Sequence, residues 1–223
     1  MQVFIAILFS YLIGSIPSGF LLTKYVMKKD VREYGSGNIG ATNVARVMGL
    51  KAGILVAVFD ILKGYLGVLV GQIILGSSLS TAILFVAVAA IAGHDWSIFL
   101  GFFGGKGVAT TFGVILRLYP LAFLVYAIIW ILLVFMTRYV SLGSIIGSMS
   151  LPLTLYFSSF ESKHVIFAVL LSLFVIYTHR ENIKRLLKGE ENRMDPDKLG
   201  KSGKSNEFKD YSNWSRQLGN RPG

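Results

Sequence analysis

The chain lacks cysteine and has few charged residues, and each deficit excludes some classes of protein. With no cysteine among 223 residues, disulfides, thiolate catalysis and cysteine metal sites are excluded. Charged residues make up only 15% of the chain, against about 25% in ordinary soluble domains. The three histidines show no metal-ligand spacing, so we expect no metal. The N-terminus lacks the basic region of a signal peptide, so its apolar run is expected to remain as a membrane span.

Long apolar runs are what the chain has instead. Hydrophobic residues make up 53% of it, and about 20 predominantly apolar residues cross a bilayer as a helix. We therefore predict an all-α polytopic membrane protein with seven transmembrane helices. The expected spans are residues 3–24, 52–75, 79–100, 105–118, 120–137, 140–158 and 163–179. Residues 1–189 are expected to form this membrane domain, and the polar residues 190–223 a disordered cytoplasmic tail.

The fourth span is expected to be short. Residues 106–117 cover only about 18 Å as a helix, whereas the hydrocarbon core is about 30 Å thick. The glycine-rich stretch before this helix would then lie at membrane depth. Non-helical backbone is tolerated there only when it is buried in protein or lines a polar cavity, and we expect a cavity.

Basic residues predict the orientation. One side of the expected membrane domain carries most of them, in four places: segment 24–51, the loop at Lys106, the turn at Arg138 and the chain from Arg180. The other side has only Arg117 and Lys163. Since positive loops stay in the cytoplasm, the N-terminus should be outside and the C-terminus inside. The net charge of +10 then indicates orientation and contact with anionic lipid rather than nucleic acid.

The stretch GSGNIGATNVAR at 35–46 contains a G-x-G-x-x-G pattern. A dinucleotide site needs this pattern between a strand and a helix, but a membrane span and a charged segment precede it, so that interpretation is rejected. Asp60, the acidic residue that would contact a ribose, is expected to pair with Lys63 in its own helix. The glycine-rich backbone amides of this stretch, its short hydroxyl side chains and Arg46 are groups that can bind an anion. The alternative is an interfacial turn with a snorkelling arginine.

A second cluster surrounds the run GFFGGKG at 101–107. It fails as a Walker loop, because the spacing is too short and Gly107 replaces the Ser or Thr that would hold magnesium. The remaining GGKG before a short helix offers backbone amides and the Lys106 ammonium to an anion. Close helix packing with a snorkelling lysine is the alternative. We expect His94, just upstream, to be structural.

A third cluster combines Ser141 with the segment HRENIKR at 179–185. On a helix His179 and Asn182 share a face, whereas Glu181 points elsewhere and is expected to brace Arg138 or Arg180. His179 lies where a span leaves the membrane, so it is a candidate general base or a hydrogen-bond donor to phosphate. An ordinary basic cap on the last helix is the alternative. The chain has no acidic cluster for magnesium and no G-x-S-x-G nucleophile.

These motifs resemble the bacterial acyl-phosphate-dependent glycerol-3-phosphate acyltransferases. The resemblance covers residues 1–189 and is carried by GSGNIGATNVAR, FDILKG, GHDWSIFLGFFGGKGVAT, RYVSL and HRENIKRLL. It implies a multi-pass inner-membrane enzyme of phospholipid biosynthesis whose active site faces the cytoplasm. Such an enzyme transfers an acyl group from acyl phosphate to the 1-hydroxyl of glycerol 3-phosphate, giving lysophosphatidic acid and phosphate. No cofactor is implied, and a soluble enzyme that makes acyl phosphate is an implied partner.

The resemblance also implies roles for residues. Its catalytic set is Arg46, Lys106, Ser141, His179 and Asn182; its phosphate- or substrate-binding set is Ser36, Gly37, Asn38, Thr42, Gly104, Gly105 and Gly107; its structural set is Asp60, Lys63 and Glu181. Which loop holds which phosphate stays open. For the proton we favour a substrate phosphate as acceptor, with His179 as an orienting donor. An organic-phosphate transporter is the main alternative, but it predicts internal repeats that we do not find; a lipid phosphatase lacks a nucleophile–base set.

Overall fold

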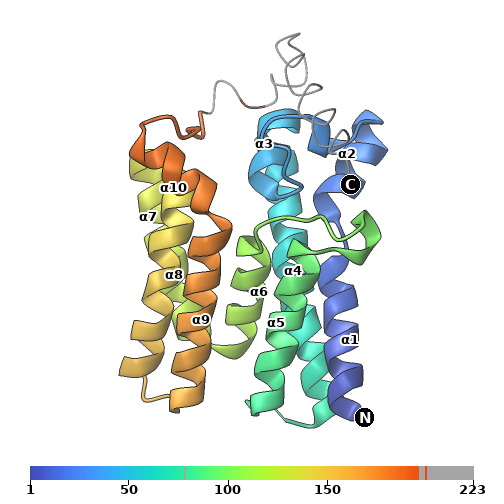
Figure 1. The fold of residues 1–223 in the computed structure, drawn as a ribbon, viewed down its shortest axis with the longest axis vertical. Helices are drawn as coiled ribbons and strands as arrows, with labels where there is room; N and C mark the ends of the chain where they lie inside the picture. Colours follow the sequence, from blue (N-terminus) through green and yellow to red (C-terminus); the bar gives the residue numbers. More distant parts are fainter. Residues whose placement is uncertain (78, 196–198, 200–223) are drawn as a thin grey trace, which may run out of the picture. The chain divides into compact units, whose positions relative to one another are not determined.

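The computed structural model describes residues 1–77, 79–195 and 199, and within them every regular element is a helix (Figure 1). The α-helices are α1 (Gln2–Ser15), α2 (Ser18–Met27), α3 (Ala41–Met48), α4 (Leu50–Leu75), α5 (Thr81–Asp95), α6 (Val108–Leu118), α7 (Pro120–Thr137), α8 (Val140–Phe157), α9 (Ser162–Thr178) and α10 (Arg180–Leu187). Two short 3-10 helices are η1 (Val31–Glu33) and η2 (Ile98–Leu100). The described chain is thus all-helical, as the sequence predicts.

The chain divides into two compact units. The first comprises Met1–Pro17 and Val58–Met194, and the second comprises Ser18–Ala57 and the chain from Asp195 onward. The chain passes from one unit to the other at three places: after Pro17, inside α4 after Ala57, and after Met194.

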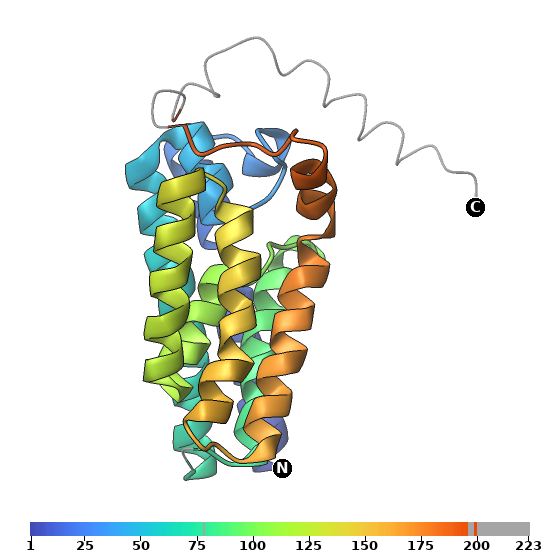
Figure 2. The same ribbon diagram turned by 90° about the vertical axis from the view of Figure 1, so that its left-hand side faces the viewer.

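The first unit is a bundle of upright helices. α1 packs along α5, while α7, α8 and α9 lie side by side, with α6 against both α5 and α7 (Figures 1 and 2). Small residues bring α1 and α5 close together: a Cβ on Gly14 would lie 2.0 Å from the carbonyl oxygen of Ala90, and one on Gly93 2.3 Å from that of Tyr11. Close backbone approach of this kind is how helices associate in a bilayer, where burial of apolar surface gives little drive.

The helices carry the apolar surface of an integral membrane protein. Five segments are long and apolar enough to cross a bilayer: Gln2–Met27, Leu50–Leu75, Thr81–Leu100, Pro120–Thr137 and Val140–Phe157. The bent pair α9–α10 is a sixth if it counts as one span, and α6 is a shorter apolar helix. Only 11% of the apolar window of α7 is buried within the protein. Its outward side chains therefore need lipid around them.

Local breaks separate the observed helices from the expected spans. The expected first span, residues 3–24, is interrupted at Ile16 and Pro17, because proline disfavours helical geometry in the residue before it and removes a backbone donor; Ile16 has φ −58° and ψ 115°. The expected fourth span begins at Val108 rather than residue 105, since Gly104–Gly107 are not helical. The last span ends at Thr178, and α10 continues at an angle of 61° (Figure 2).

The second unit is built around a loop that η1 and α3 enclose. α2 contacts both η1 and α3. The contact needs glycine, because a Cβ on Gly19 would lie 2.0 Å from the carbonyl oxygen of Ile39. Asp30 caps η1 and binds the Arg32 guanidinium at 2.6 Å. Burial would raise the pKa of Asp30, but the hydrogen bonds from Arg32 and its charge outweigh burial and lower it.

The start of the expected tail is held in place. Met194 N–H donates to the carbonyl oxygen of Arg138 at 2.7 Å, and Arg193 Nε donates to the Tyr139 hydroxyl at 3.1 Å. The backbone of Met194 and the side chain of Arg193 thus have hydrogen-bond partners in the first unit. Most of the predicted tail, residues 196–198 and 200–223, lies outside the described residues.

Candidate active site

The GGKG loop connects η2 to α6 and rests on the end of α5. Gly105 N–H donates to the carbonyl oxygen of His94 at 3.0 Å. A Cβ on Gly105 would lie 1.9 Å from His94 Nε2, so only glycine fits there. Gly107 caps α6 with φ +65°, a left-handed conformation that glycine adopts without strain. The loop therefore holds Lys106 next to the N-terminus of a short apolar helix, where the helix dipole favours an anion.

Lys106 joins the second and third sequence clusters. Its Nζ donates to Asn182 Oδ1 in α10, across a sequence separation of 76 residues. Asn182 Nδ2 donates to Glu191 Oε1 at 2.6 Å, and the Ser141 hydroxyl donates to the same oxygen at 2.8 Å. The structure thus brings together three of the five predicted catalytic residues in one hydrogen-bonded chain.

Glu191 is the site residue that the sequence analysis missed. Its carboxylate also accepts from Arg185 Nε at 2.8 Å, and the side chain is buried. Burial alone would raise the pKa of Glu191, but hydrogen bonds from Asn182, Ser141 and Arg185 lower it. In the sequence, Glu191 could have been noticed as a glutamate that follows a basic helix. The polar composition of the segment around it led instead to its assignment to the tail.

Glu181 lies elsewhere, although it was the glutamate to which the sequence analysis assigned structural support. It is exposed and binds Lys184 Nζ at 3.0 Å. This ion pair is with Lys184 and not with Arg138 or Arg180, the partners expected from sequence. On α10, Lys184 lies three positions after Glu181, where two side chains meet along a helix surface.

His179 lies at the bend between α9 and α10, and its side chain is buried. Its Nδ1 is 2.8 Å from the carbonyl oxygen of Val175. Because a carbonyl only accepts, Nδ1 carries the hydrogen in this bond. In the neutral ring, Nε2 is then a hydrogen-bond acceptor. Neutral His179 is thereby suited to accept a hydrogen bond from a substrate hydroxyl.

A buried charged pair lies in α4, as the sequence predicts. Lys63 Nζ is 2.8 Å from Asp60 Oδ1 and also donates to the carbonyl oxygen of Ile16 at 2.8 Å. The expected pairing within one helix is confirmed. His94 Nδ1 lies 3.6 Å from the same oxygen of Asp60.

In the second unit, the GSGN loop is organised by Asn43. This buried side chain donates from Nδ2 to the carbonyl oxygens of Val31, Tyr34 and Asn38, and its Oδ1 accepts from Ser36 N–H at 2.8 Å. Asn43 belongs to the GSGNIGATNVAR stretch but is not among the predicted site residues. Its four bonds to the backbone give the loop its conformation.

The predicted binding residues of this loop differ in exposure. Ser36 and Gly37 are exposed, and Gly37 has φ +72°. Asn38 turns its side-chain oxygen back to Gly40 N–H at 2.8 Å. Thr42 and Arg46, on α3, are half-buried. These residues form a compact polar surface within the second unit.

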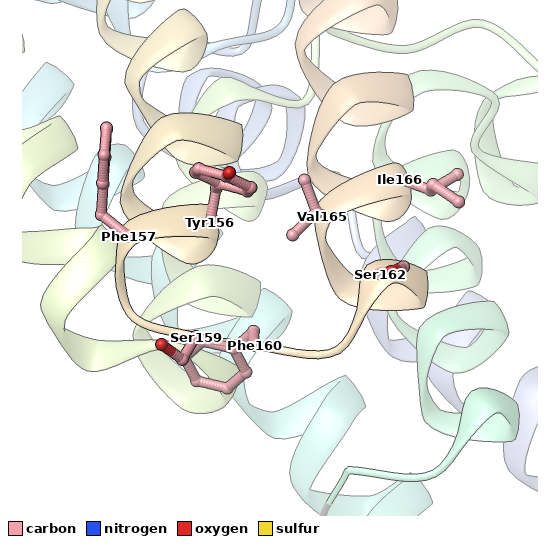
Figure 3. Close-up of a pocket in the computed structure, with 7 residues that line it drawn as sticks. All are labelled: Tyr156, Phe157, Ser159, Phe160, Ser162, Val165 and Ile166. Carbon is pink, nitrogen blue, oxygen red and sulfur yellow. The ribbon is translucent and has the colours of Figure 1, made fainter.

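A cavity of about 570 Å³ lies at the turn between α8 and α9 (Figure 3). It is lined by Tyr156, Phe157, Ser159, Phe160, Ser162, Val165 and Ile166, which present polar and apolar surface in similar amounts. Ser162 begins α9, which places this turn about 25 Å along the helix from His179. None of the predicted site residues lines the cavity.

Comparison with known proteins links this geometry to one family. Residues 4–189 match the family described as glycerol-3-phosphate acyltransferase. The glycerol-3-phosphate acyltransferase of Desulforudis audaxviator (strain MP104C) is 45% identical over 194 residues, which is 87% of this chain and 96% of the relative. That of Syntrophotalea carbinolica (strain DSM 2380) is 47% identical over 193 residues, covering 86% and 97%.

Solved structures agree with the sequence matches. The crystal structure of PlsY (YgiH), an integral membrane glycerol 3-phosphate acyltransferase, in its glycerol 3-phosphate form matches with a TM-score of 0.82 at 38% identity. The match covers 87% of this chain and 96% of that one. The lysophosphatidic acid form of the same protein matches with a TM-score of 0.80 at 37% identity, over 89% and 98%.

Proposed function

Because the chain belongs to the glycerol-3-phosphate acyltransferase family, we propose that it transfers a fatty acyl group from acyl phosphate to the 1-hydroxyl of glycerol 3-phosphate. The products are lysophosphatidic acid and inorganic phosphate. The observation that carries the proposal is the chain of hydrogen bonds from Lys106 through Asn182 and Glu191 to Ser141. It sets a cation, an amide and a hydroxyl around the GGKG loop.

The chemistry needs alignment more than covalent help. In acyl phosphate the acyl carbon already carries a good leaving group. The hydroxyl oxygen of glycerol 3-phosphate attacks this carbon, the bond from carbon to the phosphate oxygen breaks, and phosphate leaves with the electron pair. Two anionic substrates have to approach each other, so cationic and amide donors that neutralise their charge and fix their positions supply most of the rate.

The first unit offers a role for each of its polar groups. The backbone amides of Gly104 and Gly107 and the ammonium of Lys106 bind a phosphate at the start of α6. The Gly105 amide, predicted to bind phosphate as well, instead donates to the carbonyl oxygen of His94 and shapes the loop. Ser141 and Asn182, oriented by their bonds to Glu191, position glycerol 3-phosphate. In the second unit, the Arg46 guanidinium is the proposed donor for an anionic substrate. The backbone N–H groups of Ser36 and Gly37 donate within the loop, to Asn43 Oδ1 and to the carbonyl oxygen of Tyr34.

The hydroxyl proton has two acceptors within this chemistry. His179 Nε2, an acceptor in the neutral ring, holds the 1-hydroxyl in line for attack. The proton then stays on His179 as a general base or passes to a phosphate oxygen, whose second pKa is about 6. Burial and the nearby charge of Lys106 lower the pKa of His179 to about 4, which favours the phosphate as the acceptor. His179→Ala separates the two roles: loss of turnover at saturating glycerol 3-phosphate supports the base, and a rise in KM alone excludes it.

The test of the proposed function uses purified protein in detergent with palmitoyl phosphate and glycerol 3-phosphate. Phosphate release that needs both substrates and Lys106, together with lysophosphatidic acid formation, supports the proposal. Lys106→Ala and the replacement of the donor by palmitoyl-CoA are the two comparisons. Phosphate release without glycerol 3-phosphate would instead indicate a phosphatase, and turnover with palmitoyl-CoA would overturn the proposed donor.

The placement in the cell is part of the proposal. We propose seven crossings of the bacterial inner membrane, with α6 as the short one and the site open to the cytoplasm, where a soluble enzyme supplies acyl phosphate. The basic segments support this orientation. Because the chain has no cysteine, single cysteines can be labelled cleanly with a membrane-impermeant maleimide. A cysteine at Ser159 should react from outside and one at Lys188 only from inside; the reverse would overturn the orientation.

A further inference from the structure

A buried polar network beneath the GGKG loop has no part in the chemistry above. It comprises Asp60 and Lys63 in α4 and His94 at the end of α5, which are 1%, 5% and 4% exposed. Lys63 bridges the Asp60 carboxylate and the Ile16 carbonyl at 2.8 Å each, and His94 Nδ1 is 3.6 Å from Asp60. Ionisable groups inside a membrane bundle are costly and mark function by default.

Contacts connect this network to both sides of Lys106. On one side, His94 accepts the Gly105 N–H at 3.0 Å, and its ring lies so close that a Cβ on Gly105 would be 1.9 Å from Nε2. On the other side, a Cβ on Gly107 would lie 2.8 Å from Asp95 Oδ1. The two residues that flank Lys106 in sequence therefore rest on His94 and Asp95.

The contacts form a series that leads from the Asp60 carboxylate through His94 to the GGKG loop. The Asp60 carboxylate lies against both the Lys63 ammonium and His94 Nδ1, which has no hydrogen-bond partner among the described residues. Without the charge of Asp60, we expect the His94 ring to change its orientation. Because the ring lies directly against Gly105, we expect the loop and Lys106 to shift with it.

We propose that Asp60, Lys63 and His94 are positioning residues that set the conformation of the GGKG loop and thereby the place of the Lys106 ammonium. This inference rests on the proposed function, because it assigns the network an effect on the binding of a phosphate-bearing substrate by that loop. A shift of about 1 Å in a positioned group costs on the order of 100-fold in rate. The network therefore acts on substrate affinity and turnover through Lys106.

The central variant is Asp60→Asn, which keeps the shape of the side chain and removes its charge. We expect kcat/KM to fall at least about tenfold, with an increased KM for one of the two substrates. The same loss should appear in binding without turnover, as a smaller rise in Tm when glycerol 3-phosphate or inorganic phosphate is added. If Asp60→Asn does not accumulate as folded protein, His94→Gln tests the same contact.

The matched control is His164→Gln. His164 is also a buried histidine, bound to the Tyr119 hydroxyl at 2.6 Å, but it lies near the start of α9, far from His179. We expect a lower Tm with KM and kcat within about twofold of the wild type. If Asp60→Asn behaves like this control, with a lower Tm and an unchanged KM, the network is only structural and the inference is overturned.

A double variant tests whether the network acts through Lys106. Asp60→Asn combined with Lys106→Ala should lose no more activity than Lys106→Ala alone, because residues that act as one unit are not additive. Additive losses would overturn the inference. If the wild-type protein made no lysophosphatidic acid, the proposed function would fail, and the phosphate-induced Tm shifts of wild type and Asp60→Asn would still decide the inference.

Discussion

Replacement of Glu191 by alanine should both destabilise the protein and disable its site. The carboxylate accepts hydrogen bonds from Asn182 at 2.6 Å, Ser141 at 2.8 Å and Arg185 at 2.8 Å. Alanine would leave one buried amide, one buried hydroxyl and a guanidinium without this acceptor. The Arg185 side chain is 37% exposed, so most of the loss comes from the buried hydrogen bonds of Asn182 and Ser141 to the carboxylate and should total about 3 kcal/mol. For a chain of this size that corresponds to a fall in Tm of roughly 10 °C.

A graded series makes this prediction quantitative. Glu191→Gln keeps one acceptor oxygen for Ser141 and Asn182 but loses the charge and replaces the oxygen that accepts from Arg185 Nε with an NH2 group, so it should cost about 1–2 kcal/mol. The matched control is Glu190→Ala, because Glu190 is the neighbouring glutamate and is exposed. Its cost should be within about 0.5 kcal/mol of zero.

Two measurements on the same samples decide the outcome. Thermal unfolding in detergent gives the order of stability, which should be wild type and Glu190→Ala above Glu191→Gln and then Glu191→Ala. Phosphate-release kinetics should show a lower kcat/KM for Glu191→Ala, because Ser141 and Asn182 lose their orientation. Equal Tm values for Glu191→Ala and Glu190→Ala would refute the reasoning, since the three bonds would then contribute nothing.

Three further predictions follow from single contacts. Asn43→Asp should destabilise the second unit by about 3 kcal/mol, because a carboxylate oxygen would face the three carbonyls that Asn43 Nδ2 now binds. An unchanged Tm together with an unchanged kcat/KM would contradict this prediction. Gly105→Ala should raise the KM for a phosphate-bearing substrate about tenfold or more, because its Cβ would lie 1.9 Å from His94 Nε2. Gly101→Ala is the control for kinetics: its Cβ meets open space, and its φ of +65° costs only backbone strain. The pKa of Glu191 is lowered in the folded protein. Its stabilising effect is therefore fully present above the ordinary glutamate pKa of 4.5 and is lost as pH falls through the folded-state pKa. Below that pKa the Tm of the wild type should approach that of Glu191→Gln, and a Tm difference that stays constant to pH 3 would exclude this linkage.

Local chemistry made several features predictable from sequence. Each expected span overlaps an observed helix, because hydropathy over about 20 residues is a property of the segment itself. The pairing of Asp60 with Lys63 could be predicted because residues three apart on one helix always lie on neighbouring positions. The break at Pro17 could also have been predicted, since proline constrains the residue before it in any context.

The site depended on packing that no local pattern encodes. The sequence determined by itself that the chain is an all-helical membrane protein, and its motifs indicated glycine-rich polar loops near Lys106 and a polar helix start near His179. Only the tertiary structure decided that Lys106 reaches Asn182, that Glu191 rather than Glu181 is the buried carboxylate, and that His94 supports the GGKG loop. Hydropathy places a segment in the bilayer whatever its neighbours are, whereas a hydrogen bond between distant segments exists only after the helices pack and bring donor and acceptor within about 3 Å.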